Sequence, residues 1–403
     1  MNRSLFNIVR RRFLKLIIQV ILLPIYLLGK LIPKRRDLVI FGSSRGEYYS
    51  DNSKYLYEFI LKNDVGFCYY WLTKNKNLAL NFKGKNFVYI YSLKGLCLML
   101  RANIAIITHQ LNDLFPPLLG GTKIIQLWHG TPLKEIGFLS DGWKERKRWE
   151  NKMILILFKL FPYLQYNKCD YLITSTSSIK DIMANSFKIE PKRIKVLGQP
   201  RNDIFFSNNK INSSYFLKFK NKKIYSWLPT HRARTNIKII NLLKDYNFNI
   251  KEYDNFLNKN NCILIIKPHF TEIVDLSVTL KGTKNIFIYE EADPYPLLVE
   301  TDVLITDYSS VYFDYLLLNR PIIFTPFDIE LYQSKITGFN FNYYEVTPGP
   351  KCTDWIEVLK QLKEIQFYDN YFEDRLRVSK VFNNYFDNNN SKRIIDFILT
   401  IKK

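Results

Sequence analysis

DVLITDYSSVYFDYLLLNRPIIF (302–324) contains, in order, a short apolar strand, a run of small polar residues, an apolar helix and a second apolar strand. A strand followed by a helix and another strand is typical of a parallel sheet that helices cover on both faces. In such sheets ligands bind beside the carboxyl ends of the strands, where the polar residues of this stretch lie. The stretch therefore predicts an α/β fold with a binding site after its first strand.

The same alternation of strands and helices occurs along most of the chain, in two series. The first series occupies 37 to about 203, and the second restarts with KIYSWLPTHR (223–232) after a polar stretch rich in Asn and Lys. That polar stretch marks a domain boundary. We therefore expect two doubly wound, Rossmann-like α/β domains, over 37–206 and 223–403, that face each other across a ligand-binding cleft. The strands are expected within 37–44, 67–73, 87–91, 103–110, 123–130, 171–177, 223–232, 262–270, 285–291, 302–310 and 321–327.

The composition fits a large folded protein. Of the 403 residues, 47% are hydrophobic and 24% are charged, so the chain can bury a sizeable core. Five scattered cysteines without a CxxC pair argue against a disulfide framework and a zinc site, and favour a reducing compartment. The net charge of +22 requires an anionic partner. Anionic lipid or a phosphate-bearing substrate is favoured over nucleic acid, because the chain has no recognisable nucleic-acid-binding module.

The N-terminal segment, 1–36, is predicted to associate with a membrane. An apolar stretch, 14–32, is interrupted by Gln19, Pro24 and Lys30, which makes it a weak membrane span. Basic residues stand before it and at its start: Arg3, Arg10, Arg11, Arg12 and Lys15. No small-residue cleavage site of a signal peptide follows it. We expect an uncleaved segment that lies on or dips into an anionic membrane surface, with a buried first helix and a true single span as the alternatives.

A second candidate membrane patch is WKERKRWENKMILILFKLFPYL (143–164), which has a basic half and a dense apolar half. Its periodicity predicts a pair of amphipathic helices. Trp143 and Trp149 suit a membrane interface, and the neighbouring positive charge suits anionic lipid. A core helix is the alternative.

The chain has four histidines, His109, His129, His231 and His269, and each stands at or just past the end of an expected strand. His129 is the strongest candidate for catalysis. It lies in QLWHGTPLKEIG (126–137), where Gly130 permits a tight turn before Thr131 and Pro132 can start a helix. An imidazole at that helix N-terminus could take a proton from a hydroxyl, because its ordinary pKa is near neutrality. A purely structural histidine is the alternative.

Cationic and hydroxyl-bearing residues follow three strands of the second series. Lys267 precedes His269 in IIKPHF, and His231 is followed by Arg232, so both strand ends could neutralise phosphate oxygens. Solvent-exposed charge is the alternative for the arginine. Asp307, Ser309 and Ser310 separate an apolar strand from a helix and predict a phosphate site there.

Several other chemistries are disfavoured. The chain has no GxxxxGK[ST] loop, no GxGxxG after a strand, no HExxH and no GxSxG. We therefore expect no metal and no cofactor. Glu290, Glu291 and Asp293 could hold a metal in principle, but adjacent acids on a loop are usually solvated.

Four motifs, in this order, resemble those of the CDP-glycerol glycerophosphotransferase family of teichoic acid and capsule synthesis: WHGTPLKEIG (128–137), GQPRND (198–203), KPH (267–269) and the stretch 302–324. The resemblance covers roughly 37–365. It implies a glycosyltransferase-B-like fold and a peripheral location on the cytoplasmic face of the cell membrane. It also implies transfer of glycerol phosphate or ribitol phosphate from a CDP-alditol to a lipid-linked acceptor, an undecaprenyl-diphosphate-linked glycan, with release of CMP.

The resemblance also assigns roles to residues. It implies that His129 is the catalytic base and that His269 contacts the donor pyrophosphate. The expected substrate-binding residues are Gly130, Thr131, Arg201, Thr230, His231, Arg232, Lys267, Asp307, Ser309 and Ser310. The chain departs from the family pattern at His231, where an aromatic residue is common, and at Thr337, where an arginine is common. Both departures leave the alditol open.

Two other functions remain possible from the sequence. A glycosyltransferase of the same fold that uses a nucleotide sugar would also have a phosphate site in its second domain. A membrane-bound scaffold without activity is the non-enzyme alternative, and the presence of both motif histidines argues against it. The lack of a large extra domain favours addition of one or a few units over processive polymerisation.

Overall fold

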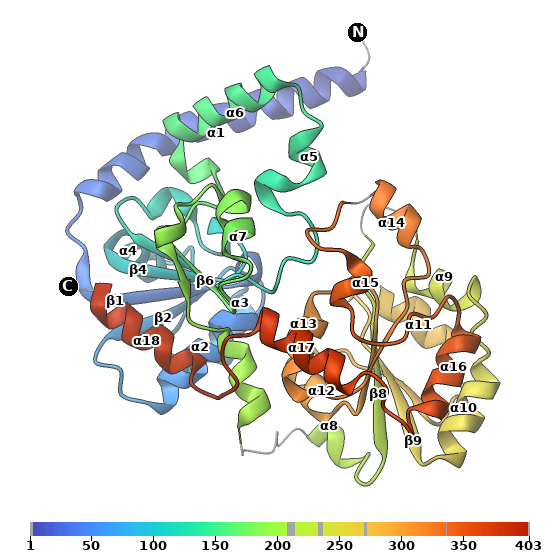
Figure 1. The fold of residues 1–403 in the computed structure, drawn as a ribbon. Helices are drawn as coiled ribbons and strands as arrows, with labels where there is room; N and C mark the ends of the chain where they lie inside the picture. Colours follow the sequence, from blue (N-terminus) through green and yellow to red (C-terminus); the bar gives the residue numbers. More distant parts are fainter. Residues whose placement is uncertain (1–2, 208–213, 233–236, 270–271, 336, 402–403) are drawn as a thin grey trace.

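Residues 3–207, 214–232, 237–269, 272–335 and 337–401 are described by the structure, a computed structural model (Figure 1). Two parallel sheets organise the molecule, and strands from the first half of the chain build the larger one. Its seven strands have the order β3-β2-β1-β4-β5-β6-β7. They are β1 (Arg35–Gly42), β2 (Cys68–Thr73), β3 (Phe87–Tyr89), β4 (Ala102–Ile107), β5 (Lys123–Gln126), β6 (Tyr171–Thr174) and β7 (Ile194–Val196).

The smaller sheet has five strands in the order β10-β9-β8-β11-β12, again all parallel. In both sheets the chain runs outward from the middle in one direction and then in the other, which is the doubly wound arrangement. The predicted pair of doubly wound α/β domains is thus confirmed. The strands are β8 (Lys223–Leu228), β9 (Cys262–Ile266), β10 (Ile286–Ile288), β11 (Val303–Thr306) and β12 (Ile322–Phe324).

Helices cover both faces of each sheet, as the apolar strands require. In β1, Val39 and Phe41 point into one core cluster, while Leu38 and Ile40 point into another on the opposite face. All four side chains are buried, because helices pack on both sides. The helices of the first half are α1 (Arg3–Leu31), α2 (Asp51–Lys62), α3 (Lys76–Asn81), α4 (Leu93–Arg101), α5 (Asp141–Lys144), α6 (Arg148–Leu160) and α7 (Lys180–Phe187).

The last helix returns to the first sheet. Ile394, Ile395 and Ile398 of α18 belong to the same core cluster as Val39 and Phe41 (Figure 1). The predicted domain boundaries stay predictions, and part of the segment 223–403 packs on the first sheet. The helices of the second half are α8 (Ser214–Leu217), α9 (Ile239–Lys244), α10 (Ile250–Lys259), α11 (Ile273–Thr279), α12 (Tyr295–Glu300), α13 (Val311–Tyr315), α14 (Ile329–Lys335), α15 (Tyr343–Val346), α16 (Trp355–Glu364), α17 (Phe372–Phe382) and α18 (Asn390–Ile401).

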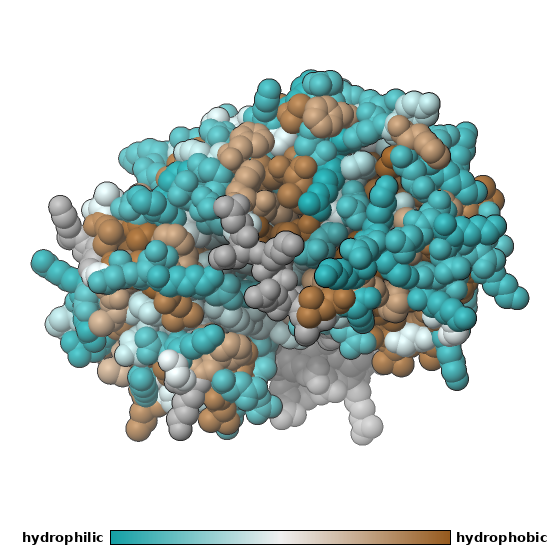
Figure 2. Space-filling model, turned by 90° about the horizontal axis from the view of Figure 1, so that it is seen from below, coloured by the Kyte–Doolittle hydropathy of each residue, from teal (hydrophilic) through white to brown (hydrophobic). Residues whose placement is uncertain are grey.

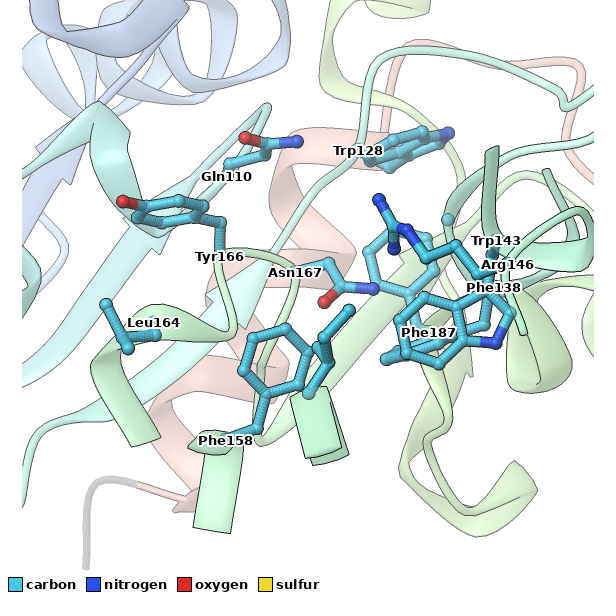
Figure 3. A pocket seen from close by; sticks show the side chains of 12 residues that line it. Gln110, Trp128, Phe138, Trp143, Arg146, Phe158, Leu164, Tyr166, Asn167 and Phe187 are labelled. Carbon is cyan, nitrogen blue, oxygen red and sulfur yellow. The ribbon is translucent and has the colours of Figure 1, made fainter. Parts of the chain in front are cut away.

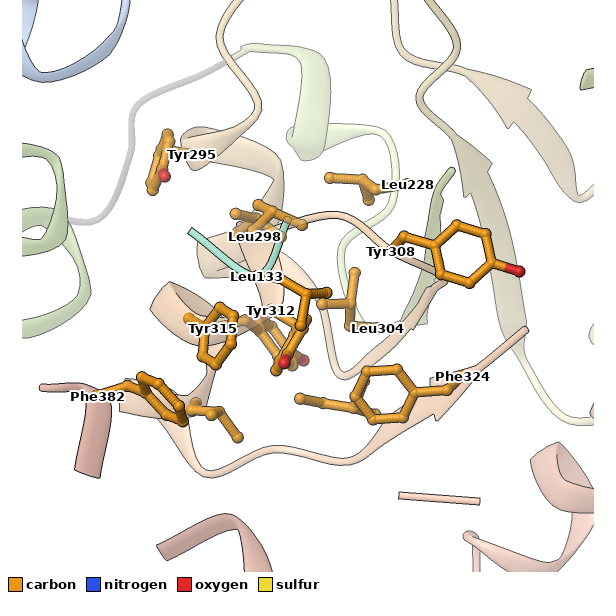
Figure 4. Close-up of a cluster of buried hydrophobic side chains, with 14 of the residues drawn as sticks. Leu133, Leu228, Tyr295, Leu298, Leu304, Tyr308, Tyr312, Tyr315, Phe324 and Phe382 are labelled. Carbon is orange, nitrogen blue, oxygen red and sulfur yellow. The ribbon is translucent and has the colours of Figure 1, made fainter. Parts of the chain in front are cut away.

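The helix expected to start at Thr131 is absent, and that prediction is wrong. Residues 131–136 form an irregular loop with a bend at Leu133, and Lys134 forms an antiparallel bridge with Phe339 of the second half. Asn340 donates its backbone N–H to the carbonyl of Leu133 over 2.8 Å and its side-chain amide to Pro132. Leu133 is buried beside Tyr312 and Leu304 in the core of the second sheet (Figure 4). Burial of Leu133 and these hydrogen bonds outweigh the local preference for a helix.

Helices α1 and α6 lie on the surface of the first half (Figure 1). Helix α6 has no buried residue, and from 17 to 31 the side chains of α1 are mostly exposed or half-exposed, so neither is a core helix. The hydroxyl of Tyr163, just after α6, donates to the backbone carbonyl of Gln19 in α1. The side chains of 1–16, which include the basic cluster, lie outside the described residues. None of the described helices has both the length and the hydropathy needed to span a bilayer.

Candidate active site

Two adjoining cavities lie between the sheets, near the carboxyl ends of strands from both. The first has a volume of about 290 Å³ and is lined by Ser44, Ser50, Asp51, His109, His129, Arg201, Ala292, Pro294, Tyr295, Ser309, Ser310 and Val311. The second, of about 420 Å³, is lined by Ser44, Arg45, Tyr48, Ser50, His109, Lys267, Pro268, His269, Glu290 and Ala292. Because the two cavities share Ser44, Ser50, His109 and Ala292, they form one cleft.

His129 lies in the first cavity, three residues beyond β5. Its ring lies 3.9 Å from the ring of Trp128 and 4.6 Å from the ring of His109, which is nearly parallel to it. Burial, reinforced by His109, lowers the pKa of His129 to about 3. The imidazole is therefore neutral at pH 7, which is the form that can accept a proton.

His109 follows β4 and belongs to both cavities. Its Nδ1 accepts the backbone N–H of Ser44 over 3.2 Å, while its Nε2 lies 3.9 Å from a carboxylate oxygen of Asp51. Burial raises the pKa of Asp51, but Arg201 and the two histidines together hold it below its ordinary value. The carboxylate thus stays ionised beside His109.

Two residues beside the cavity hold unusual backbone conformations. Trp128 has φ 58° and Asp51 has φ 63°, both in the left-handed region that side chains disfavour. The side-chain amide of Asn52 donates to the carbonyl of Trp128 over 2.7 Å and also to the side chain of Gln199. Strain of this kind persists only where the surrounding structure enforces it, and it clusters at functional sites.

Arg201, from the motif GQPRND, joins the two halves of the molecule. Its guanidinium bonds Asp51 over 2.6 Å and Asp314 of α13 over 2.7 Å. Asp314 also accepts from the hydroxyl of Tyr295 and the amide of Asn202. Burial lowers the pKa of Arg201, but Asp314, Tyr295 and Asp51 more than compensate and raise it. The buried cation therefore fixes α2 and α13 relative to each other.

Gly130 lets the loop after His129 approach Ser310. A Cβ atom at Gly130 would stand 2.7 Å from the Ser310 hydroxyl, and its φ of 141° also disfavours a side chain. Ser309 and Ser310 accordingly face the same cavity as His129. Thr131, the next residue of the loop, is buried. Thr337, where the family pattern has an arginine, donates to the carbonyl of Glu135 in this loop.

Lys267 and His269 line the second cavity, after β9. The ring of His269 stacks on that of His231 with 3.9 Å between centroids, and His231 lies 3.8 Å from Glu272. Burial lowers the pKa of Lys267, and burial together with His231 lowers the pKa of His269. The structure thus brings both strand ends together at one side of the cleft.

Arg232 and Asp307 form a buried cluster of charges. Arg232 pairs with Asp307 over 2.8 Å and with Asp328 over 2.8 Å. Asp307 also accepts the backbone N–H of Thr230. These residues line neither cavity as described above, and the carboxylates satisfy the guanidinium that the sequence predicted for phosphate. Their substrate-binding role stays a prediction.

The sequence did not point to Asp51, Asp314 and Tyr295, which surround Arg201. Asp51 and Asp314 stand within helices, where an isolated acid is usually on the surface. A usable signal for Asp314 was its position between aromatic residues in VYFDY (311–315), because an apolar helix rarely buries an unpaired acid.

Comparison with known families agrees with the motifs. The model of the CDP-glycerol:poly(glycerophosphate) glycerophosphotransferase family matches residues 25–400. The chain belongs to this family. The matched residues include both sheets and the loop that carries His129.

Similar proteins of the glycerophosphotransferase family come from teichoic acid synthesis. A teichoic acid glycerol-phosphate transferase of Staphylococcus aureus is 28% identical and covers 93% of this chain and 96% of its own length. A teichoic acid poly(glycerol phosphate) polymerase of Bacillus subtilis is 29% identical over 90% of this chain, which spans about half of that longer protein (50%). The wall teichoic acid polymerase TagF has a similar structure, with a TM-score of 0.71, 25% identity and coverage of 100% of this chain and 98% of that one.

Proposed function

We propose that the chain transfers glycerol phosphate or ribitol phosphate from a CDP-alditol to a hydroxyl of a lipid-linked glycan, with release of CMP, in teichoic acid or capsule synthesis. The observation that carries this proposal is the first cavity, where neutral His129 from one sheet faces Ser309 and Ser310 from the other. A base and anion-binding hydroxyls are the groups that transfer of a phosphate to an alcohol needs.

The acceptor hydroxyl gives its proton to His129 as its oxygen attacks the phosphorus that carries the alditol. A bond forms between that oxygen and phosphorus, and the bond to the CMP oxygen breaks, so CMP leaves with the electron pair. His129 is neutral before this step, but the burial that keeps it neutral also disfavours the imidazolium that the step forms. The charge of Asp51, which raises the pKa of His129, offsets part of that cost. Positioning and charge stabilisation supply most of the rate in such transfers.

The donor is proposed to lie along the cleft from Ser310 to His269. Ser309 and Ser310 hold oxygens of the transferred phosphate, while Lys267 and His269 contact the pyrophosphate and stabilise the charge that builds on CMP. Arg201, Gly130 and Thr131 shape the acceptor side. His231 positions His269, because the two rings stack on each other. Thr230, Arg232 and Asp307 line neither cavity, and we propose that they support the donor side by joining the loops after β8 and β11 through buried hydrogen bonds.

The reaction is tested with purified protein and a prenyl-diphosphate disaccharide acceptor. We expect CMP to be released from CDP-glycerol or CDP-ribitol, and the donor that reacts identifies the alditol. A nucleotide-sugar glycosyltransferase of the same fold would instead release UDP or GDP from its sugar donor. Turnover of a nucleotide sugar, with both CDP-alditols inert, contradicts the proposal.

The chain is further proposed to act as a peripheral protein on the cytoplasmic face of an anionic cell membrane. Trp149 and Leu160 of α6 are 63% and 58% exposed, and α1 exposes Ile21, Leu28 and Leu31. Figure 2 views the molecule from the side away from α1 and α6, and hydrophilic residues predominate there. An apolar helix face with basic neighbours suits anionic lipid. All five cysteines are unpaired, which fits a reducing compartment.

Replacing Trp149 and Leu160 together by Ser is expected to weaken binding to anionic lipid vesicles by at least about tenfold, because each apolar side chain that leaves the interface costs roughly 1.5–3 kcal/mol. Co-sedimentation with vesicles measures the change. Phe367→Ala removes an even more exposed aromatic ring from the second half and should leave vesicle binding as it is. Equal binding of the double variant and the wild type would show that α6 does not contact the membrane.

A further inference from the structure

A third cavity lies beside the cleft, on the surface of the first half. Its volume is about 430 Å³, and its lining includes Trp128, Phe138, Trp143, Arg146, Phe158 and Asn167. We call it the aromatic groove (Figure 3). Trp128 belongs to its wall, and the ring of Trp128 lies 3.9 Å from that of His129. One indole ring therefore connects the groove with the candidate base.

The lining of the groove combines flat apolar faces with hydrogen-bonding groups. Phe138 and Trp143 stand edge to face with 4.6 Å between ring centroids, and the Arg146 guanidinium lies 5.5 Å from the Trp143 ring. In Figure 3 the Asn167 amide lies between the aromatic rings. A sugar ring has an apolar C–H face, which packs on an aromatic ring, and hydroxyls at its edge, which amide and guanidinium groups bind. The Asn167 amide donates an N–H to the carbonyl of Ser186 over 3.4 Å, so its oxygen and the exposed Arg146 guanidinium are the groups that a sugar hydroxyl would meet. An alkyl chain would form no hydrogen bond with either group.

The groove also lies in the right place for an acceptor glycan. Ile154 and Phe158, one helical turn apart on α6, line the groove. Trp149, Ile156 and Leu160 are exposed on the other side of the same helix. The exposed apolar surface, helix α6, the groove and His129 therefore follow one another in this order. A glycan that reaches from a membrane lipid beside α6 to a reacting hydroxyl beside His129 would lie along the aromatic groove.

We propose that the aromatic groove binds the acceptor sugar next to the reacting hydroxyl. This inference rests on the proposed function, because it assigns a part of the same acceptor. Trp143 provides a stacking face, while Asn167 and Arg146 bind sugar hydroxyls. Trp128 forms the wall between this sugar and the ring of His129, so that only the hydroxyl beyond that wall reaches the first cavity.

The test uses a soluble acceptor, an N-acetylhexosamine disaccharide on a short alkyl diphosphate, which lacks a long lipid chain. Trp143→Ala and Asn167→Ala are each expected to raise the KM for this acceptor about tenfold or more, while the KM for the CDP-alditol changes by less than about twofold. Trp143 lies in α5, so its replacement could disturb that helix. Asn167→Ala tests the same groove without changing α5. Phe367→Ala is the matched control, because it removes an exposed aromatic ring outside the groove and should leave the KM for the acceptor unchanged.

Direct binding separates this inference from the proposed reaction. Without donor, the soluble acceptor should bind the wild type and bind Trp143→Ala and Asn167→Ala about tenfold more weakly, as measured by calorimetry. That result supports the sugar site even if no CDP-alditol turns over, which would overturn only the proposed function. Unchanged KM and unchanged binding in both variants overturn the sugar site. A defect that occurs only with a long prenyl chain also overturns it and assigns the groove to the lipid.

Discussion

His129→Ala is expected to lower kcat for alditol-phosphate transfer by about 100- to 10,000-fold, the usual contribution of a general base. The dissociation constant of the CDP-alditol should change little, because Lys267, His269, Ser309 and Ser310 remain in the cleft. Single-turnover release of CMP and a separate donor-binding titration measure the two quantities. We expect kcat to fall while donor binding is kept, because the proposed role of His129 is to take the proton of the acceptor hydroxyl and not to bind the donor.

His231→Ala is a useful comparison for the His129 variant. His231 stacks on His269 in the second cavity, so its loss should affect the KM for the donor more than kcat. Near-normal kcat in His129→Ala would remove His129 from the mechanism and make His109, whose ring lies 4.6 Å away, the candidate to examine.

Arg201→Met is expected to lower the free energy of unfolding by about 3–5 kcal/mol, because it leaves the buried carboxylate of Asp314 and the half-buried carboxylate of Asp51 without their cation. Asp51 and Asp314 both bond this guanidinium, and Arg201 and Asp314 are almost fully buried. The loss should grow as the pH rises through the ordinary pKa of an aspartate, because Arg201 helps to hold the pKa of Asp51 below that value in the folded wild type. Urea-induced unfolding, followed by circular dichroism, gives the difference between variant and wild type.

Arg377→Ala provides the matched control for Arg201→Met. Its pair with Asp374 is exposed on α17, where an ion pair contributes little to stability. If Arg201→Met were no less stable than Arg377→Ala, the buried pair of carboxylates would not depend on Arg201, and the account of how α2 and α13 are held together would be wrong.

Most of the fold could be predicted because its strands are buried on both faces. A run such as LVIF in β1 is apolar without alternation, which distinguishes it from exposed strands and loops. β7 was not predicted, since IKV (194–196) is three residues long and has a lysine at its centre. The loop 131–136 was predicted to start a helix, and this prediction failed because the partner that holds the loop, Asn340, is about 200 residues away in the sequence. Local patterns carry no information on such contacts.

The candidate site was predictable in its strand-end residues and not in its helical ones. His129, Ser309 and Ser310 meet in one cavity, as expected of residues that follow parallel strands. Arg201, which only the family motif suggested, joins them there. Arg232 was expected to face phosphate, yet it pairs with Asp307 and Asp328. A sequence shows that an arginine follows a strand, but it does not show which acids surround it after folding.

The proposed chemistry is tested most directly by the mass of the acceptor after reaction. Purified protein is incubated with CDP-glycerol, CDP-ribitol or a nucleotide sugar and with a prenyl-diphosphate disaccharide, and the lipid product is analysed by mass spectrometry. Transfer across the cleft predicts an increase by whole glycerol phosphate or ribitol phosphate units that is lost in His129→Ala. An increase by a hexose or N-acetylhexosamine, with no addition from either CDP-alditol, would contradict the account.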